Sequence, residues 1–246
     1  MECVVNGQRF TAQAGDIIHL TPYTSHGFRF LEEGTIWREL FQEIDMSGGI
    51  LEKNLVKKNY PQLLEDEEFL SMYRAGKSLS RETPVPVDVP REQVPQLRTP
   101  DFAIVRHEGE GFSLKLKVGK WETNGCKEIW QADLKQGLFV DYAYPHAGYE
   151  LLYVKSGKLK VTIMDKTYVV EGDTLIDIPP YHTYSLRALE DTSLYNYGGQ
   201  HDLMALLEDL RSVKEHDPKR IEKREDYLKF LRKYGVYATS IEYTRP

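Results

Sequence analysis

Short stretches of alternating apolar and polar residues fill two parts of the chain, residues 1–44 and 101–198. In the first part, Val4 and Val5 stand before Asn6-Gly7, a dipeptide typical of two-residue hairpin turns. In the second part, pieces such as YELLYVKSG and KLKVTIM have the pattern of β-strands, and Gly-containing turns separate many of them. Many short strands at this spacing predict an antiparallel barrel or sandwich.

Other parts of the chain have a different pattern. Residues 61–78 and 200–235 carry apolar side chains at helical spacing, and Asp217-Pro218 is typical of the start of a second helix within the latter range. Five prolines in residues 83–100 disfavour helix and central strand, so this segment is predicted to be a linker or an extended arm packed on a surface. The tail after Gly235 is predicted to contain a late strand.

Length and composition limit the class of protein. A chain of 246 residues suits one large domain or two small ones. The net charge of −6 argues against nucleic acid as the main partner, and no apolar window approaches the roughly 18 residues that a membrane span needs. Two cysteines cannot make a disulfide framework. We therefore expect a cytoplasmic protein without a nucleic-acid or membrane partner.

The two strand-rich parts share one pattern. Each has a strand, a tight turn, a second strand, a Gly-Asp pair, an apolar strand and then Pro-Tyr followed by ring-bearing residues. The Gly-Asp pairs are Gly15-Asp16 and Gly172-Asp173. Two copies of one β unit separated by a helix and a linker predict a duplicated barrel.

At these residues the sequence resembles the cupin superfamily, and as a whole it resembles a bicupin. Four residues fall in the frame of the first cupin motif, H-x-H-x3-E-x6-G, and four match the second, G-D-x5-P-x3-H. The resemblance implies a mostly β fold of duplicated antiparallel jelly-roll (double-stranded β-helix) barrels with added helices. The motif residues are Tyr144, His146, Glu150 and Gly157, and then Gly15, Asp16, Pro22 and His26.

This resemblance divides the chain into four parts. They are a partial N-terminal barrel (1–60), a helix and Pro-rich linker (61–100), a C-terminal barrel (101–198) and helices packing on that barrel (199–246). The first copy lacks the strands that would bear its first histidine pair and its glutamate. Either the start is misassigned, or the sequence is a fragment, or another segment fills the gap.

The resemblance also implies a metal site. His146, Glu150 and His182 are the expected ligands of a divalent Mn, Fe, Zn or Ni ion in the second copy, and His26 is an expected ligand in an intact first copy. Alignment of the two Pro-Tyr pairs places Tyr184 rather than His182 opposite His26, and a two-residue shift restores His182. Tyrosine at histidine positions is also consistent with a second copy that has lost its metal.

Two functions follow from these residues. The first is a metal-dependent enzyme acting on a small oxygenated organic molecule, as an isomerase, decarboxylase, ring-opening hydrolase or dioxygenase, with Glu150 as base and Tyr184 as acid. The alternative is a non-catalytic module that binds a small molecule, similar to a sensor barrel without a DNA-binding domain. A homodimer is expected because cupin sheets commonly pair, and His107 is predicted to be exposed at a turn.

Overall fold

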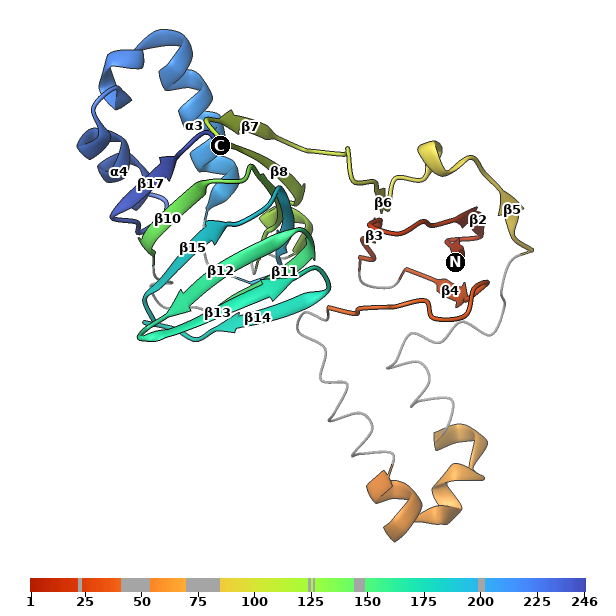
Figure 1. Ribbon diagram of the computed structural model, residues 1–246. Coiled ribbons are helices and arrows are strands. Elements are labelled where there is room, and N and C mark those ends of the chain that lie inside the picture. Colours follow the sequence, from red (N-terminus) through yellow and green to blue (C-terminus); the bar gives the residue numbers. More distant parts are fainter. Residues whose placement is uncertain are drawn as a thin grey trace. The chain divides into compact units, whose positions relative to one another are not determined.

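The chain folds into two compact units, Met1–Leu97 (unit 1) and Arg98–Pro246 (unit 2). The structure is a computed structural model that describes residues 1–21, 24–40, 54–69, 85–123, 125, 127–143, 149–198 and 202–246. Figure 1 shows that strands are the predominant secondary structure of the described chain and that the helices are few. The prediction of a mostly β fold with added helices is confirmed.

In the part of unit 2 that the structure describes, eleven strands form two sheets. Their bounds are β7 Arg106–Gly109, β8 Phe112–Val118, β9 Ile129–Leu134, β10 Leu138–Ala143, β11 Glu150–Ser156, β12 Lys158–Ile163, β13 Lys166–Glu171, β14 Thr174–Ile178, β15 Tyr184–Ala188, β16 Thr192–Asn196 and β17 Ser240–Tyr243. One sheet has the order β14-β11-β16-β9-β8-β7, and the other has the order β13-β12-β15-β10-β17. Figure 1 shows the second sheet in front.

The pairing of β9 to β16 is nested. The innermost strands β12 and β13 form a hairpin, β11 pairs with β14, β10 pairs with β15, and β9 pairs with β16, all antiparallel. Successive pairs alternate between the two sheets. The pairs β12–β13 and β10–β15 lie in one sheet, and the pairs β11–β14 and β9–β16 lie in the other. This is the strand order of a jelly roll, the architecture to which cupins belong. The jelly-roll prediction is therefore confirmed for unit 2.

The core of unit 2 lies between its two sheets. Alternate residues of each strand point inward, as the period of two in a strand requires. Leu152 and Val154 of β11 and Leu194 of β16 are at most 2% exposed, and they face Leu159 and Val161 from the other sheet. Burial of each such side chain contributes about 1.5–3 kcal/mol. The inward positions next to these residues at one end of the sheet are polar, and they form the site described below.

Two helices extend this core. Helix α3 spans Leu203–His216, and Asp202 caps it by accepting a hydrogen bond from the backbone N–H of Ala205. After the 3-10 turn η4 (Pro218–Ile221), helix α4 spans Arg224–Arg232. The predicted second helix thus begins later than Asp217-Pro218, because the extended backbone of Lys223 separates η4 from α4. Among the described residues, no helix is long and apolar enough to cross a membrane.

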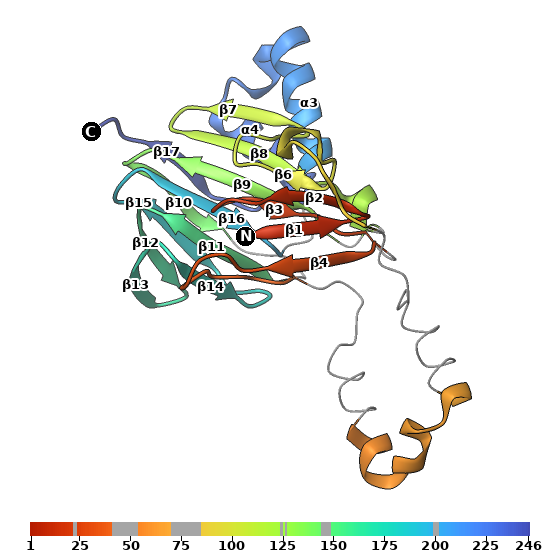
Figure 2. The ribbon, with the colours of Figure 1, turned by 90° about the vertical axis from the view of Figure 1, so that its right-hand side faces the viewer.

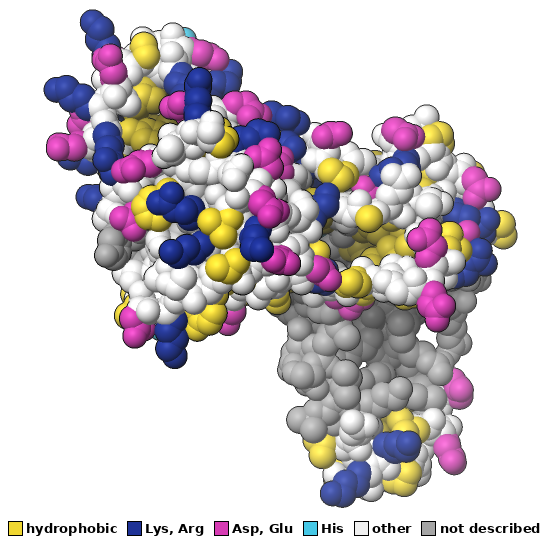
Figure 3. All heavy atoms as spheres, viewed as in Figure 1, with side chains coloured by type: hydrophobic (Ala, Val, Ile, Leu, Met, Phe, Trp, Pro, Cys, Tyr) yellow, Lys and Arg dark blue, Asp and Glu magenta, His cyan; other side chains and the backbone are white. Residues whose placement is uncertain are grey.

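The helices pack where the two sheets diverge. Figures 1 and 2 both show α3 and α4 beside β7, β8 and β17. Leu206, Leu210 and Phe230 form a helical core that contacts Trp130 and Ile241, and these two residues also contact the barrel core. In the view of Figure 3, acidic and basic side chains are interspersed over unit 2 rather than gathered into one basic area.

Unit 1 is built on a four-stranded sheet of order β4-β1-β2-β5, with β3 and β6 paired separately. Asn6 and Gly7 both have positive φ in the turn between β1 and β2, as the hairpin prediction requires. The described part of the predicted helix 61–78 is not one continuous helix: residues 61–64 form η1 and residues 67–69 are helical, whereas residues 70–78 lie outside the described residues. Another helical stretch, residues 54–59, precedes it. The bounds are β1 Glu2–Val5, β2 Gln8–Thr11, β3 Ile17–Ile18, β4 His26–Arg29, η1 Pro61–Leu64, β5 Val87–Asp88, η2 Arg91–Gln93 and β6 Leu97–Arg98.

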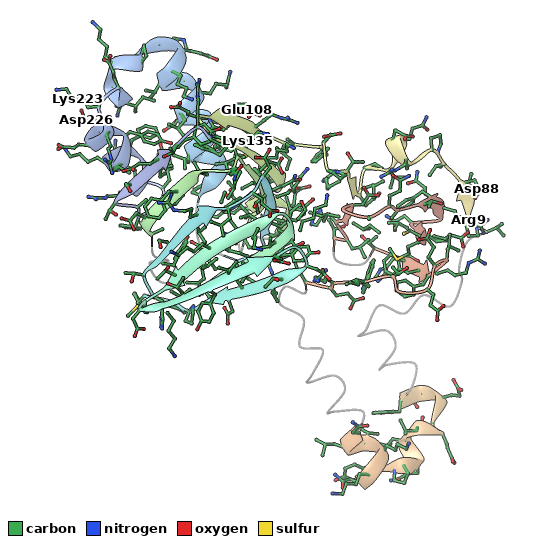
Figure 4. All side chains as sticks on the ribbon, viewed as in Figure 1. Arg9, Asp88, Glu108, Lys135, Lys223 and Asp226 are labelled. Carbon is green, nitrogen blue, oxygen red and sulfur yellow. The ribbon has the colours of Figure 1, made fainter. Side chains whose placement is uncertain are left out.

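Residues 85–97 of the Pro-rich segment belong to unit 1, and unit 2 begins at Arg98. Strand β5 of this segment runs parallel to β2, and Figure 4 shows Arg9 of β2 beside Asp88 of β5. Val94 and Leu97 are buried with the side chains of β1 and β2. The sequence left two interpretations of this segment open, a linker and an extended arm packed on a surface. The contacts of residues 85–97 agree with the second.

The two units contain sheets with the same strand pairing. In unit 1, β1 pairs with β2 and β4, and in unit 2, β12 pairs with β13 and β15. The register also agrees, because Val5 at the end of β1 lies opposite His26, and Ile163 at the end of β12 lies opposite Tyr184. His26 and Tyr184 therefore occupy equivalent places, each at the start of its strand.

Candidate functional site

A hydrogen bond joins the two sheets of unit 2 inside the barrel. Glu150 is the first residue of β11 and Tyr184 is the first residue of β15, and these strands belong to opposite sheets. The Tyr184 hydroxyl donates to Oε2 of Glu150 over 3.1 Å. Glu150 is 3% exposed and Tyr184 is 9% exposed. The structure thus brings together the two residues that the sequence predicts to be catalytic.

Asn196 is the third member of this group, at the end of β16. Its Nδ2 donates to Oε2 of Glu150 over 3.2 Å, and its Oδ1 accepts a hydrogen bond from the backbone N–H of Gly198 over 2.9 Å. The second bond fixes the orientation of the amide, so the amino group is directed at the carboxylate. Asn196 is fully buried. We call Glu150, Tyr184 and Asn196 the polar centre.

The charge of Glu150 and the burial of Tyr184 keep this tyrosine protonated. Burial raises the pKa of the Tyr184 phenol well above its ordinary value, and the adjacent negative charge and hydrogen bond of Glu150 raise it further. The phenol is therefore a neutral hydrogen-bond donor over the physiological pH range.

A second buried carboxyl group lies at the same end of the sheet. Glu128 directly precedes β9, is 4% exposed, and accepts a hydrogen bond at Oε1 from the backbone N–H of Met204 at the start of α3. Strands β9 and β11 flank β16 and both begin at the end where β16 finishes, because both pair antiparallel with it. Glu128 and Glu150 therefore lie at the same end of the two strands that flank β16.

The other predicted ligands are distributed differently. His182 is half-buried in the turn before β15, and its Nδ1 lies 3.0 Å from the carbonyl oxygen of Pro180. His26 is exposed at the start of β4 in unit 1, where its Nδ1 lies 2.9 Å from the carbonyl oxygen of Thr24. His146 lies outside the described residues. Strand β15 begins at Tyr184, whose side chain is buried in the barrel core, whereas His182 lies in the turn before it. Tyr184, not His182, therefore takes the inward position at the start of β15.

The described side chains do not make a metal site by themselves. In the part of the chain that the structure describes, no three His, Cys, Asp or Glu side chains are grouped so as to hold a metal ion. The polar centre offers one carboxylate, one neutral phenol and the amino group of an amide, and only the first of these suits a divalent metal. A metal at Glu150 thus depends on His146 and His182, and it stays a prediction.

Sequence analysis missed Asn196 and Glu128, and it misplaced His107. His107 was predicted to be exposed at a turn, but it lies within β7 and is 7% exposed, beside the ring of Phe112. Helix α3 lies against β7, and the hydrogen bond from Lys214 Nζ to the carbonyl oxygen of Glu108 joins them, which the local sequence does not reveal. For Asn196, the available signal is the two-residue period of the predicted strand TSLYN. That period places residue 196 on the same face as the apolar Leu194.

Comparison with known proteins gives likenesses to solved structures only. No protein-family model matches the sequence, and no curated protein matches it. The structure of KdgF from Halomonas sp. shares 14% identity, with a TM-score of 0.35, over 40% of this chain and 89% of the other. An RmlC-like cupin from Shewanella frigidimarina NCIMB 400 shares 14% identity, with a TM-score of 0.35, over 41% and 85%.

A third similar structure belongs to a larger protein. Salicylate 1,2-dioxygenase from Pseudoaminobacter salicylatoxidans, solved with gentisate, shares 18% identity with a TM-score of 0.34. The match covers 42% of this chain and 28% of that one. The jelly-roll assignment of unit 2 rests on its own strand pairing.

Proposed function

We propose that unit 2 is a cupin-type barrel that acts on a small oxygenated organic molecule, with Glu150 as base and Tyr184 as acid. The observation that carries this proposal is the buried hydrogen bond between their side chains, which come from opposite sheets. Burial of a carboxyl group in an apolar core is unfavourable unless its hydrogen bonds are satisfied, and a smaller apolar residue would avoid that penalty. Buried ionisable groups of this kind are concentrated at functional sites.

The chemistry of the polar centre suits proton transfer. The Glu150 carboxylate can accept a proton from a carbon or hydroxyl group next to a carbonyl. Tyr184 retains its proton and can donate it to an oxygen on which negative charge develops. Asn196 holds the carboxylate in place through Nδ2. General acid–base catalysis by positioned groups of this type contributes about 10²–10⁴-fold in rate.

A metal-dependent reaction is the second candidate, with Mn, Fe, Zn or Ni bound by His146, Glu150 and His182. The observation that favours it is the contact between His182 Nδ1 and the Pro180 carbonyl oxygen. Histidines that bind a metal through one ring nitrogen commonly donate the other N–H to a backbone carbonyl. Nε2 of His182 would then be the ligand atom. Such an ion would polarise a bound carbonyl group.

The equivalent pairing in unit 1 extends the proposal to the first copy. We infer that β1, β2 and β4 repeat β12, β13 and β15, so His26 is the counterpart of Tyr184. The Pro-rich segment then supplies part of the packing that barrel strands supply in unit 2, through Val94 and Leu97. We also propose that the protein is a homodimer, which light scattering on the purified protein tests.

The test of function compares the purified protein with two variants and their matched controls. Glu150→Gln and Tyr184→Phe are assayed with a panel of small hydroxy-ketones and aldoses, by proton exchange with solvent in NMR and by ligand-induced thermal shift. Glu171→Gln and Tyr168→Phe are the controls, because Glu171 lies on the surface beside Lys158 and Tyr168 is 48% exposed. Loss of exchange in the first pair alone supports the acid–base proposal.

Elemental analysis of the same protein separates the two candidates. Stoichiometric metal that disappears in His146→Ala and His182→Ala supports the second candidate. Proton exchange that persists at full rate in metal-free protein supports the first. Unchanged exchange in Glu150→Gln would contradict both.

A further inference from the structure

We propose that the outer face of the smaller sheet of unit 2 is a docking surface for an acidic protein segment in extended conformation, with one apolar side chain on each side of its carboxylate. This sheet has the order β13-β12-β15-β10-β17. Figure 1 shows the sheet in front, and Figure 3, in the same view, shows dark-blue and yellow side chains side by side over it. The surface lies outside the barrel, so the inference does not depend on the chemistry proposed for the polar centre.

The side chains of each strand in this sheet alternate between the barrel core and the outer face. Leu159 and Val161 of β12 are buried in the core, so Lys160, which lies between them, points outward. By the same alternation, Arg187 of β15 points outward because it precedes the buried Ala188. Both Lys160 and Arg187 are exposed. Two neighbouring strands therefore present a lysine and an arginine on the outer face.

Lys160 and Arg187 lie directly opposite each other in the antiparallel pair of β12 and β15. Like charges in directly opposed positions destabilise a pair of strands. Lys158, the preceding outward residue of β12, is by contrast neutralised by Glu171, whose Oε1 lies 2.7 Å from its Nζ. Among the described residues, no carboxylate forms an ion pair with Lys160 or Arg187. Two adjacent positive charges are thus left uncompensated, and they favour a partner that brings a negative charge.

An apolar side chain stands at each end of the row that contains this pair. Val169 of β13 lies opposite Lys160, and Phe139 of β10 lies opposite Arg187. Val169 is 55% exposed, and the guanidinium carbon of Arg187 lies 4.5 Å from the centre of the Phe139 ring. This cation–π contact stabilises the position of the arginine charge on the row. Across four neighbouring strands the row is therefore apolar, positive, positive and apolar.

Hydroxyl groups line one side of this row. Thr162 of β12 lies opposite Ser185 of β15 on one side and opposite Thr167 of β13 on the other. The Oγ1 atoms of Thr162 and Thr167 lie 2.9 Å apart. Hydroxyl groups both donate and accept hydrogen bonds, so they suit the backbone N–H and C=O groups of an extended segment. The face can therefore bind the backbone of a partner as well as its side chains.

The spacing of the row defines the pattern of the partner. Neighbouring strands lie about 4.8 Å apart, so Val169 and Phe139, which are separated by three strand intervals, lie about 14 Å apart. An extended chain advances about 3.4 Å per residue, and its alternate side chains point to the same side. Two apolar residues four positions apart therefore reach Val169 and Phe139, and an acidic residue midway between them lies over Lys160 and Arg187. A segment of the pattern apolar-x-acidic-x-apolar matches the row in charge and in length.

The probe for this surface is the peptide acetyl-GSLSESFSG-amide, which has leucine, glutamate and phenylalanine at the required spacing. Two control peptides replace the glutamate with glutamine (GSLSQSFSG) or bring the three residues together (GSSLEFSSG). Binding to the full-length protein is measured by calorimetry, and the contact surface is mapped from amide shifts in NMR spectra. We expect the probe to bind about 10-fold more tightly than either control, with shifts in β12, β15, β10 and β13. Its affinity should fall as the salt concentration rises.

The variants Lys160→Gln and Val169→Thr test the charged and the apolar part of the row. Lys160→Gln should weaken peptide binding about 5–10-fold and leave the melting temperature unchanged or raised, because it relieves the repulsion by Arg187. Val169→Thr keeps a β-branched strand residue but removes an apolar contact, so binding should weaken about 3-fold. Lys166→Gln is the matched control, because Lys166 is exposed on β13 opposite Ile163, which packs against the barrel core.

Four results would overturn the proposal. The first is the absence of peptide binding, and the second is equal binding of the glutamate and glutamine peptides. The third is unchanged affinity in Lys160→Gln, and a lower melting temperature in this variant would show that the lysine is structural. The fourth is a set of amide shifts that inorganic phosphate reproduces at the same concentration, because the face would then bind a small anion and not a protein segment.

Discussion

The hydroxyl of Tyr184 and Oε2 of Glu150 lie 3.1 Å apart, although the two residues begin strands in opposite sheets. This bond fixes the distance between the starts of β11 and β15 at one end of the barrel. Because both side chains are buried, the bond contributes to stability as well as to the chemistry proposed above.

Tyr184→Phe tests the contribution of this bond to stability. The substitution keeps the ring and removes one donor from a buried carboxylate, so we expect the free energy of unfolding to fall by about 1–3 kcal/mol. Urea unfolding followed by fluorescence measures the change. Tyr168→Phe, at an exposed position of β13, is the control and should change stability by less than about 0.5 kcal/mol. Equal effects of the two substitutions would contradict the assigned bond.

The sequence predicts two of the three residues of the polar centre. Glu150 lies within the frame of the motif that the sequence resembles, and the alignment of the two repeats places Tyr184 opposite His26, so the resemblance and the repeat together identify both. Asn196 lies in β16, which pairs antiparallel with β11, and Glu128 directly precedes β9, which pairs antiparallel with the other edge of β16. Their place at the same end of the sheet as Glu150 is set by the register of those pairs, and no local pattern encodes that register.

The Pro-rich segment shows a similar limit. Its prolines predict the absence of a central strand, and the structure agrees, because β5 lies at the edge of its sheet. The sequence does not predict that Val94 and Leu97 enter the core of unit 1. The partner surface for these two apolar residues is formed by strands about eighty or more positions earlier in the chain.

His107 makes stability depend on pH. Burial, and then the positive charge of Lys214, lower the pKa of this imidazole to about 4. In the unfolded chain the group takes up a proton near pH 6.5. Between these values the unfolded chain binds more protons than the folded one, so stability contributed by neutral His107 is lost as the pH falls from about 6.5 to 4.

The measurement is urea unfolding at a series of pH values. Between pH 7 and 4 the free energy of unfolding should fall less in His107→Gln than in the unmodified protein, by up to about 3 kcal/mol. His216→Gln, at an exposed position of α3, should leave the decline as it is. A decline of the same size in His107→Gln and in the unmodified protein would show that other groups cause it.

Lys117 anchors the chain where it enters unit 2. Its buried ammonium group binds backbone carbonyl oxygens of the segment 99–102. Lys117→Met leaves these carbonyls without this donor, so we expect the free energy of unfolding to fall by about 2–4 kcal/mol. We also expect faster amide exchange at Ile104, whose N–H donates to the carbonyl oxygen of Leu116, and at Leu116, whose N–H donates to that of Val105. Hydrogen-exchange NMR measures the second effect. Lys135→Met, on the surface beside Asp191, should show neither.

Asp16 and Arg91 join the Gly-Asp turn of unit 1 to the Pro-rich segment. Nη2 of Arg91 lies 2.8 and 2.6 Å from the two carboxylate oxygens of Asp16, whose side chain is 1% exposed, and Asp16 also accepts the backbone N–H of Gln13. Removal of one partner of a buried ion pair leaves the other charge uncompensated.

We therefore expect Asp16→Ala to destabilise unit 1 by about 3–5 kcal/mol, measured by hydrogen exchange at β1 and β2, without change in unit 2. Asp88→Ala, which removes the exposed partner of Arg9, should cost less than about 1 kcal/mol. An equal loss in both variants would show that the packing of Val94 and Leu97, and not the ion pair, holds the Pro-rich segment in place.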